Sequence, residues 1–257
     1  MSEKVNEDLK TAVIEKPNAC IITFFMNNID MKSVGLQRSV VEKYNKSKHP
    51  HYSIHTDMKH GASIDFAWAL NGVPHPTFKG HNVEKKIDHE IILFLDVDAI
   101  PLNEDAIDYT VGLAASGHLV GDIQNSNHIQ NDKHLFVAPS VLAISVSTMA
   151  TIKYPSAVET KRADVAEEIT FAAEKFGIPI DFYYPLCYDE KPAECEFWTL
   201  KEGMPVYGRG TTFGHEQETR DNFLVKDSVP MFWHQFQSFH PGQQEKFWKK
   251  CEEVLQK

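Results

Sequence analysis

The sequence of 257 residues has no long hydrophobic run and little cysteine. No apolar stretch approaches the roughly 20 residues that a membrane-spanning helix needs, and the polar start MSEKVNEDLK lacks the basic-then-apolar pattern of a signal peptide. The four cysteines lie far apart without any C-x-x-C pair, which excludes a zinc knuckle and a disulfide framework. We therefore expect a soluble protein without a membrane span, located in the cytoplasm of the producing or host cell.

Positive charge is also scarce, because 26 Lys and Arg residues stand against 36 Asp and Glu residues and give a formal net charge of −10. This balance provides no global attraction to nucleic acid or to anionic membranes. A nucleic-acid substrate would therefore need a local basic groove. No proline-rich or serine-rich linker interrupts the chain, so we expect a single domain over residues 1–257.

Strand-like and helix-like segments alternate in the first half of the chain. The runs at 18–26 and 90–98 are largely apolar and typical of buried strands, and 51–58 is a further strand candidate, whereas 30–45 and 61–72 have helical spacing. This alternation predicts an α/β fold with a mostly parallel, Rossmann-related central sheet flanked by helices. The later part contains aromatic and glycine-bearing pieces and predicts an irregular C-terminal lobe that ends in a helix.

Two aspartates end the most strand-like segment. Asp96 and Asp98 directly follow the apolar run 91–95 and form the only D-x-D of the sequence. Because side chains alternate along a strand, positions i and i+2 point the same way, so both carboxylates can bind one hard cation. Ligands of open α/β sheets bind beyond the carboxyl ends of the strands. The motif therefore predicts a Mg²⁺ or Mn²⁺ site shared with a substrate phosphate, and an ordinary exposed turn is the alternative.

Two enzyme classes place a D-x-D after an apolar strand. Phosphatases of the haloacid-dehalogenase type use the first aspartate as a nucleophile, but their motif lies on the first strand and has Thr or Val where this chain has Ile100. The other class fits better. The sequence resembles nucleotide-sugar glycosyltransferases of the GT-A fold, in which the D-x-D holds a divalent cation against the diphosphate of the donor.

Three further segments carry this resemblance, which extends over about residues 18–185. KHGASIDFA precedes the D-x-D, VAPSVLAIS resembles the segment that lines the acceptor side, and RADVAEEIT resembles the acidic helix start with the catalytic carboxylate. A sugar nucleotidyltransferase would need a glycine-rich loop after the first strand, and TFFMNNIDMKS contains no glycine. The resemblance implies that about 18–125 bind the nucleotide sugar and about 126–257 bind the acceptor and form the C-terminal lobe.

The resemblance also implies roles for individual residues. The cation would be held by Asp96, Asp98 and a C-terminal histidine, with His234 preferred over His215 and His240. Asp164 is the expected catalytic base if the reaction inverts configuration, with Glu167 or Glu168 as substitutes; a retaining reaction needs no such base. Each of these side chains also has an ordinary structural interpretation. The expected contacts of the donor and the transferred sugar are Thr23, Asn27, His60, Asp65, Asp96, Gln124 and Arg209.

These expectations describe a metal-dependent hexosyl- or pentosyltransferase. It would use a UDP- or GDP-sugar with Mn²⁺ or Mg²⁺, and its acceptor would be a glycan, a protein or a hydroxymethylated pyrimidine in viral DNA. Two alternatives stay open at this point. One is an aspartyl-nucleophile phosphatase, and the other is a nucleotide-sugar-binding protein without catalysis.

Overall fold

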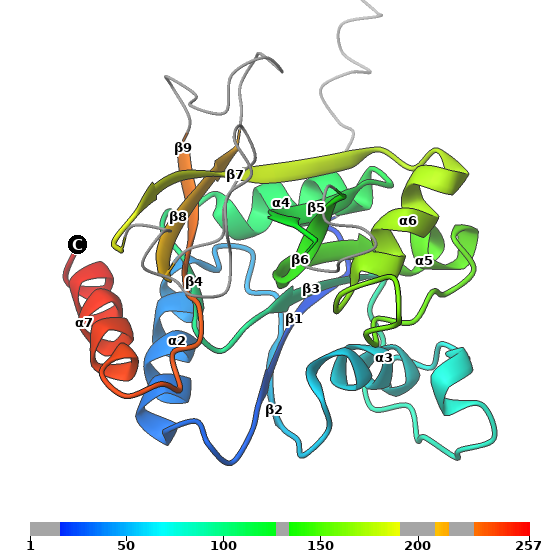
Figure 1. Cartoon of the computed structure of the whole chain (residues 1–257), viewed down its shortest axis with the longest axis horizontal. Coiled ribbons are helices and arrows are strands. Elements are labelled where there is room, and N and C mark those ends of the chain that lie inside the picture. The colour runs from blue at the N-terminus through cyan, green and yellow to red at the C-terminus, as the bar shows by residue number, and fades with distance from the viewer. Residues whose placement is uncertain (1–15, 127–133, 191–208, 216–228) are drawn as a thin grey trace, which may run out of the picture.

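The computed structural model describes residues 16–126, 134–190, 209–215 and 229–257. In this part of the chain, nine strands form one sheet in the order β2-β1-β3-β6-β5-β7-β8-β9-β4. Figure 1 shows the strands with helices packed around them. None of the helices within the described ranges is long and apolar enough to cross a membrane.

The helices and strands agree in type with most segments expected from the sequence. The strands are β1 (Ala19–Phe25), β2 (His51–His55), β3 (Ile91–Leu95), β4 (Ala99–Pro101), β5 (Leu119–Asn125), β6 (Leu135–Ser145), β7 (Ile180–Tyr188), β8 (Arg209–His215) and β9 (Val229–Gln235). The helices are α2 (Met31–Tyr44), α3 (His60–Leu70), the short η1 (Pro76–Phe78), α4 (Ala106–Ala115), α5 (Val146–Thr151), α6 (Glu167–Phe176) and α7 (Gln243–Gln256).

The centre of the sheet is mixed but mostly parallel, as predicted. Strand β1 is parallel to β2 and β3, and β5 is parallel to β7. Strand β6 lies between β3 and β5 and is antiparallel to both. Thus β1, β2, β3, β5 and β7 share one direction and β6 is reversed, which confirms the α/β class. The described part of the C-terminal region is regular, because β8 and β9 extend the same sheet with antiparallel pairing.

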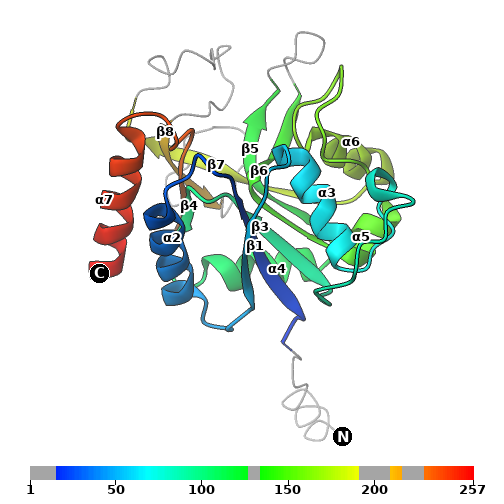
Figure 2. The ribbon, with the colours of Figure 1, turned by 90° about the horizontal axis from the view of Figure 1, so that it is seen from below.

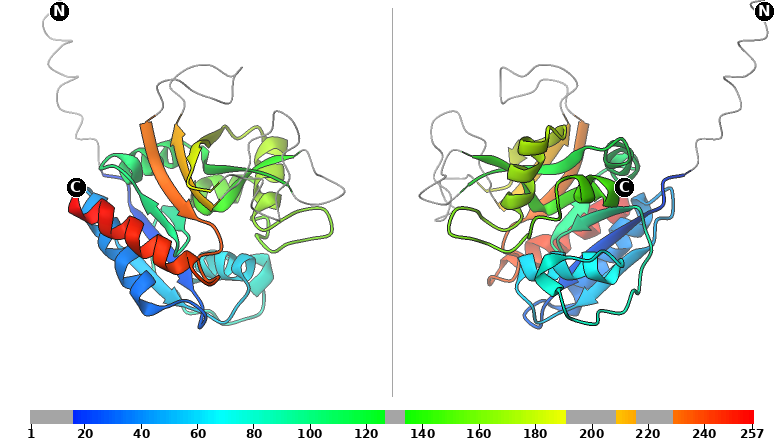
Figure 3. Two further views of the ribbon diagram at one scale, coloured as in Figure 1. Left: turned by 60° about the vertical axis from the view of Figure 1, so that its left-hand side comes forward. Right: turned by 90° about the vertical axis from the view of Figure 1, so that its right-hand side faces the viewer.

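Alternating side chains of β3 divide the core between the two faces of the sheet. Ile91, Leu93 and Leu95 pack with residues of α4, whereas Ile92 and Phe94 pack with residues of α3 and α6. A third apolar cluster joins α2, α7 and β9. Figure 2 shows α2 and α7 together on one side of the molecule and α3, α5 and α6 on the other. The views in Figure 3 confirm that α7 lies against α2. Both faces of the sheet are therefore covered, as the continuous apolar run of β3 requires.

The short strand β4 has a special place in this arrangement. It follows β3 after a turn at residues 96–98 and pairs with β9, so that Ala99 lies opposite His234. Residues far apart in the sequence thereby meet at the carboxyl end of β3.

Candidate functional site

The turn that carries the two aspartates is fixed by backbone hydrogen bonds on several sides. Within the turn, the Ala99 amide donates to the Asp96 carbonyl at 2.9 Å. The Asp96 amide donates to the carbonyl of Ser140 in β6, and the Gln235 amide of β9 donates to the Asp98 carbonyl, both at 2.9 Å. Strands β6 and β9 thus hold the turn in place, and the turn determines where the two carboxylates lie.

Asp96, Asp98 and His234 form a cluster whose potential ligand atoms all lie within 4.8 Å of one another. The His234 Nε2 atom is 3.1 Å from Asp98 Oδ1 and 3.9 Å from Asp96 Oδ2. Asp98 and His234 are buried, with 8% and 2% of their surface exposed, while Asp96 is partly accessible. Two carboxylate oxygens and one imidazole nitrogen are a donor set that suits a divalent cation such as Mn²⁺.

The charges in this cluster influence one another strongly. Burial raises the pKa of Asp96, but the facing imidazoles of His60 and His234 outweigh it and hold that pKa below its ordinary value. Burial lowers the pKa of His234, but Asp98, Asp96 and Asp122 outweigh this effect, so the net shift is upward. The two imidazoles and the two carboxylates thus stabilise each other's charged forms.

His60 lies beside the cluster, as expected from the sequence. It is the first residue of α3, and its Nε2 atom is 3.0 Å from Asp96 Oδ1. The next residue, Gly61, packs so tightly that a Cβ atom there would lie 2.4 Å from the Ala157 carbonyl oxygen. Glycine at this position lets α3 approach the 155–158 segment and brings His60 to the site.

A cavity of about 210 Å³ opens directly beside the cluster. Its lining includes the charged or ionisable side chains of Asp96, Asp98, His60 and His234. Most of the remaining lining is apolar and comes from the ends of β1 and β2 and from the segment after β9. Its main apolar residues are Phe24, Phe25, Met26, Ile29, Met58, Phe236 and Phe239. The lining thus combines metal-ligating side chains with an apolar surface.

Two of the expected donor contacts have structural partners and do not line this cavity. Thr23 is buried, where its Oγ1 atom accepts a hydrogen bond from Gln37 and lies 3.0 Å from His51 Nε2. The buried carboxylate of Asp65 accepts hydrogen bonds from the Thr77 hydroxyl, the Ser156 hydroxyl and the Ala157 amide at 2.6, 2.6 and 2.7 Å. Asp65 thus joins α3 to two distant loops.

Asn27, Arg209 and Gln124 are the remaining expected donor contacts, and none of them lines the cavity. Asn27 is exposed after β1 and bonds to His55 and Asp57, next to the cavity residues Phe25 and Met26.

Arg209 lies behind the cavity wall. It donates to the side chain of Gln237, which lines the cavity, at 3.3 Å. Gln124 is buried within β5 and is not among the residues that line the cavity.

The expected catalytic carboxylates also lie outside the cavity wall. Glu167 is fully buried, where it accepts hydrogen bonds from the Ser126 hydroxyl at 3.0 Å and from the Asp164 amide at 2.6 Å. Its other oxygen is 2.6 Å from His134 Nδ1. Asp164 is partly buried and accepts from the Val165 amide. These contacts give Glu167 a structural role as an anchor of the loop before α6, and they leave Asp164 as the more accessible carboxylate.

Glu168, the second substitute, forms an ion pair with Arg162. Its carboxylate accepts hydrogen bonds from Nη2 and Nε of Arg162 at 2.5 and 2.8 Å. This ion pair holds the pKa of Glu168 below its ordinary value.

Of the three C-terminal histidines, only His234 belongs to the cluster. His215 lies against the Tyr109 hydroxyl at 3.1 Å and is 3.9 Å from Asp181. His240 stacks on Phe239 in the turn before α7.

Sequence reasoning missed two buried polar residues near the cluster. Asp122 lies in β5 with an exposed fraction of zero, and burial raises its pKa to about 8 although His234 and Ser140 oppose this shift. Gln37 of α2 lies beneath the D-x-D turn. Both had a signal in the sequence. Asp122 interrupts an apolar strand, and Gln37 occupies a position on the apolar face of its helix between Val34 and Val41.

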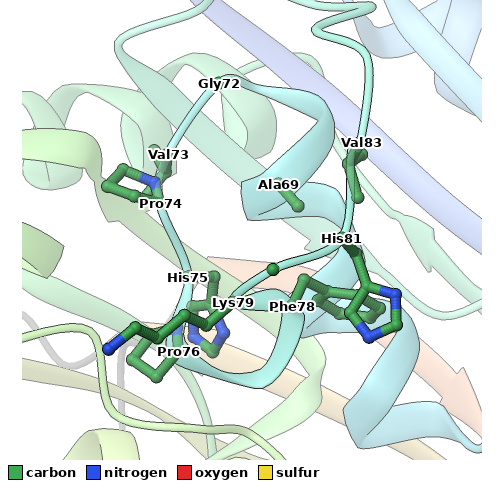
Figure 4. A pocket seen from close by; sticks show the side chains of 11 residues that line it. Ala69, Gly72, Val73, Pro74, His75, Pro76, Phe78, Lys79, His81 and Val83 are labelled. Atoms are coloured by element: carbon green, nitrogen blue, oxygen red, sulfur yellow. The ribbon is translucent and has the colours of Figure 1, made fainter.

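A larger hollow of about 580 Å³ lies elsewhere on the molecule. Figure 4 shows that its side chains come from the end of α3 and from the connection that follows, with His75, Lys79 and His81 among them. The residues that line it include no carboxylate. This hollow therefore lacks the acidic ligands that distinguish the cluster of Asp96, Asp98 and His234.

Comparison with known proteins gives similarities in structure but none in sequence. No protein-family model matches the chain, and no curated protein matches its sequence. The catalytic domain of Drosophila beta1,4-galactosyltransferase 7, solved with xylobiose, is 11% identical with a TM-score of 0.43 over 64% of this chain. The match spans 63% of that protein's chain, which is less than two thirds.

Two further solved structures match with similar scores. The galactosyltransferase LgtC, solved with donor and acceptor sugar analogs, is 12% identical with a TM-score of 0.44 over 92% of this chain and 95% of its own. The 4-diphosphocytidyl-2C-methyl-D-erythritol synthase of Anaerococcus prevotii is 12% identical with a TM-score of 0.41, over 65% and 87% of the two chains.

Proposed function

We propose that this chain is a metal-dependent glycosyltransferase that moves a sugar from a nucleotide-diphosphate sugar to an acceptor hydroxyl. The observation that carries the proposal is the cluster of Asp96, Asp98 and His234 in the lining of a cavity whose other lining residues are mostly apolar. A UDP- or GDP-sugar has a diphosphate that binds a divalent cation and an aromatic base that packs on apolar side chains. Both kinds of surface are present in this one cavity.

Asp96, Asp98 and His234 would hold the cation, and the imidazole nitrogen favours Mn²⁺ over Mg²⁺. The cation would neutralise the charge that develops on the departing nucleoside diphosphate. His60 is bonded to Asp96 and lies at the N-terminus of α3, where the helix dipole favours an anion. Together these residues would hold the diphosphate of the donor beside the cation.

The nucleoside would lie along the apolar wall near Phe25, Met26 and Met58. Asn27, which is held between His55 and Asp57, supplies polar atoms next to this wall for the base or the ribose. Arg209 reaches the wall through Gln237 and would act on the donor phosphates after a small rearrangement.

The acceptor would approach from the half of the chain that contains Asp164. A carboxylate within hydrogen-bond reach of the acceptor hydroxyl orients it in a retaining reaction or deprotonates it in an inverting one. We assign this role to Asp164, because Glu167 is fully engaged by protein donors. The transferred group would be a hexose or a pentose. Among a glycan, a protein and a modified pyrimidine in DNA, the net charge of −10 favours an uncharged glycan.

A thermal-shift screen of nucleotide sugars with and without Mn²⁺ tests this proposal. A ligand bound only by the folded state stabilises it by about 2.7 kcal/mol at a free concentration of 100 Kd. We expect at least one UDP- or GDP-sugar to raise the Tm with Mn²⁺, and the same donor to be hydrolysed slowly by the parent chain but not by Asp98→Ala. Asp88→Ala is the matched control, because Asp88 is an exposed carboxylate paired with Lys85 away from the cavity.

Three other outcomes would contradict the proposal in different ways. If no nucleotide sugar changes the Tm, the donor class is wrong. A covalent phosphate trapped on Asp96 would identify a phosphatase instead. Donor binding without hydrolysis or transfer to any acceptor would identify a binding protein.

A further inference from the structure

The buried side chain of Gln37 lies directly beneath the turn that carries Asp96 and Asp98. Its Nε2 atom donates to the Asp96 carbonyl at 3.3 Å, to the Ala99 carbonyl at 3.4 Å and to Thr23 Oγ1 at 3.1 Å. We propose that Gln37 is a positioning residue that fixes this turn and thereby sets the affinity of the site for its cation. This inference rests on the proposed metal site and adds a residue that does not touch the ligand.

The two turn carbonyls that Gln37 contacts belong to the residues that close the turn. The Asp96 carbonyl also accepts the Ala99 amide, so Gln37 binds both ends of the same hydrogen-bonded turn. If these carbonyls were free to rotate, the peptide planes that follow Asp96 and Ala99 would rotate with them. The two carboxylates would then no longer face one cation, because the backbone of the turn sets the direction of both side chains.

The surroundings of Gln37 indicate why an amide is present there. The residue has an exposed fraction of zero and lies on α2, among apolar side chains that pack against the sheet. Its Oε1 atom is buried without a hydrogen-bond partner. A buried acceptor without a partner destabilises the fold, and leucine would avoid this cost. The amide is therefore useful here for its donor group, and that group is directed at the turn.

Thr23 holds the Gln37 amide from the opposite side. Its Oγ1 atom accepts from Gln37 and lies 3.0 Å from Nε2 of His51. Burial and the nearby Arg38 lower the pKa of His51 to about 4, so this ring is neutral at pH 7. A neutral polar chain thus runs from β2 through β1 and α2 to the turn. It can fix the turn without adding charge beside the cation.

Calorimetric titration of Mn²⁺ into the full-length chain tests this role. We expect Gln37→Leu to raise the Kd for Mn²⁺ about tenfold, the lower end of the effect seen when an outer partner of a metal ligand is lost. Asn71→Leu is the matched control, because Asn71 is also a buried amide with two hydrogen bonds to backbone, at His89, on the far end of α3. Its Kd should stay within about twofold of the parent although its Tm falls, since distant sites act independently.

Thr23→Val provides a second test that keeps the amide in place. It removes the acceptor that orients Gln37 and should raise the Kd about fivefold, the loss of one ordinary hydrogen bond. Should Gln37→Leu not fold, this variant alone decides the matter. A parent-like Kd in Gln37→Leu, or in Thr23→Val when the first variant is unfolded, overturns the role of Gln37. A parent chain that binds no Mn²⁺ instead overturns the proposed metal site on which the inference depends.

Discussion

Two groups of carboxylates and imidazoles in this molecule have similar composition but different surroundings. Asp96 and Asp98 meet His60 and His234 at a cavity, whereas Glu167 meets His134 and Ser126 inside the fold. Glu167 is saturated by protein donors at both oxygens. Asp98 also has a partner at each oxygen, namely His234 and the Ser238 amide, but it lines the cavity together with the partly accessible Asp96. Residue type alone therefore does not distinguish a binding site from a structural anchor, and the difference lies in whether a cavity adjoins the charges.

The largest effect should come from removing the structural anchor. Glu167→Ala removes a partner of His134 and an acceptor of the Ser126 hydroxyl and the Asp164 amide. Loss of a buried acceptor costs about 1–3 kcal/mol of unfolding free energy for each donor that it satisfied, which urea denaturation can measure. The Kd for Mn²⁺ should not change. A stable Glu167→Ala variant that has lost its metal affinity would show that the two groups have been assigned in reverse.

For the cluster of Asp96, Asp98 and His234, we expect a large loss of metal affinity with little change in stability. Asp96→Asn keeps the shape of the side chain but removes a charged ligand, so the affinity for Mn²⁺ should fall by about 100-fold or more, beyond the usual effect of an outer partner. The unfolding free energy should fall slightly, because His60 and His234 hold the pKa of Asp96 below its ordinary value and thus favour its charged form in the folded state. Calorimetry and urea denaturation of the same variant measure both quantities. Destabilisation without any loss of affinity would place Asp96 among the structural carboxylates.

A smaller effect on stability is expected for Asp122. This residue is buried near the cluster and does not line the cavity. Its folded-state pKa of about 8 is above the ordinary value of an aspartate, so the folded state favours the neutral form. The stability that the neutral form contributes is fully present below pH 4 and is lost as the pH rises to about 8.

Asp122→Asn imitates the neutral carboxyl and therefore tests this behaviour. The variant and the parent should have equal Tm values near pH 4, and the variant should become relatively more stable between pH 5 and pH 8. Thermal unfolding across this pH series measures the difference. A constant difference over the whole range would mean that folding does not raise the pKa of Asp122.

Part of the fold and the site was predictable because it depends on short segments. The apolar run of β3 determines where Asp96 and Asp98 emerge, and the aromatic neighbours of His234 indicate a buried strand, so this cluster could be expected from the sequence. The reversed strand β6 gives no such signal, because strand direction depends on pairing over long range. The predicted divisions at about 18–125 and 126–257 stay predictions.

Other site residues could not be assigned from the sequence because their partners are distant. Asp65 bonds to Thr77 and Ser156, and Glu167 bonds to Ser126, at separations of 12, 91 and 41 residues. A carboxylate near a helix start has the same appearance in a sequence whether it faces a substrate or a loop. Gln37 was missed for another reason. It occupies a position on the buried face of its helix, where an apolar residue is expected.

Asp96, Asp98 and His234 are proposed to bind a nucleotide-diphosphate sugar through a divalent cation. Calorimetric titration of UDP- and GDP-sugars into the 257-residue chain, with and without Mn²⁺, tests this binding. We predict that one of these donors binds in the presence of Mn²⁺ and that binding is lost when the metal is removed by a chelator. Equal binding with and without Mn²⁺, or no binding of any donor in its presence, would contradict the claim.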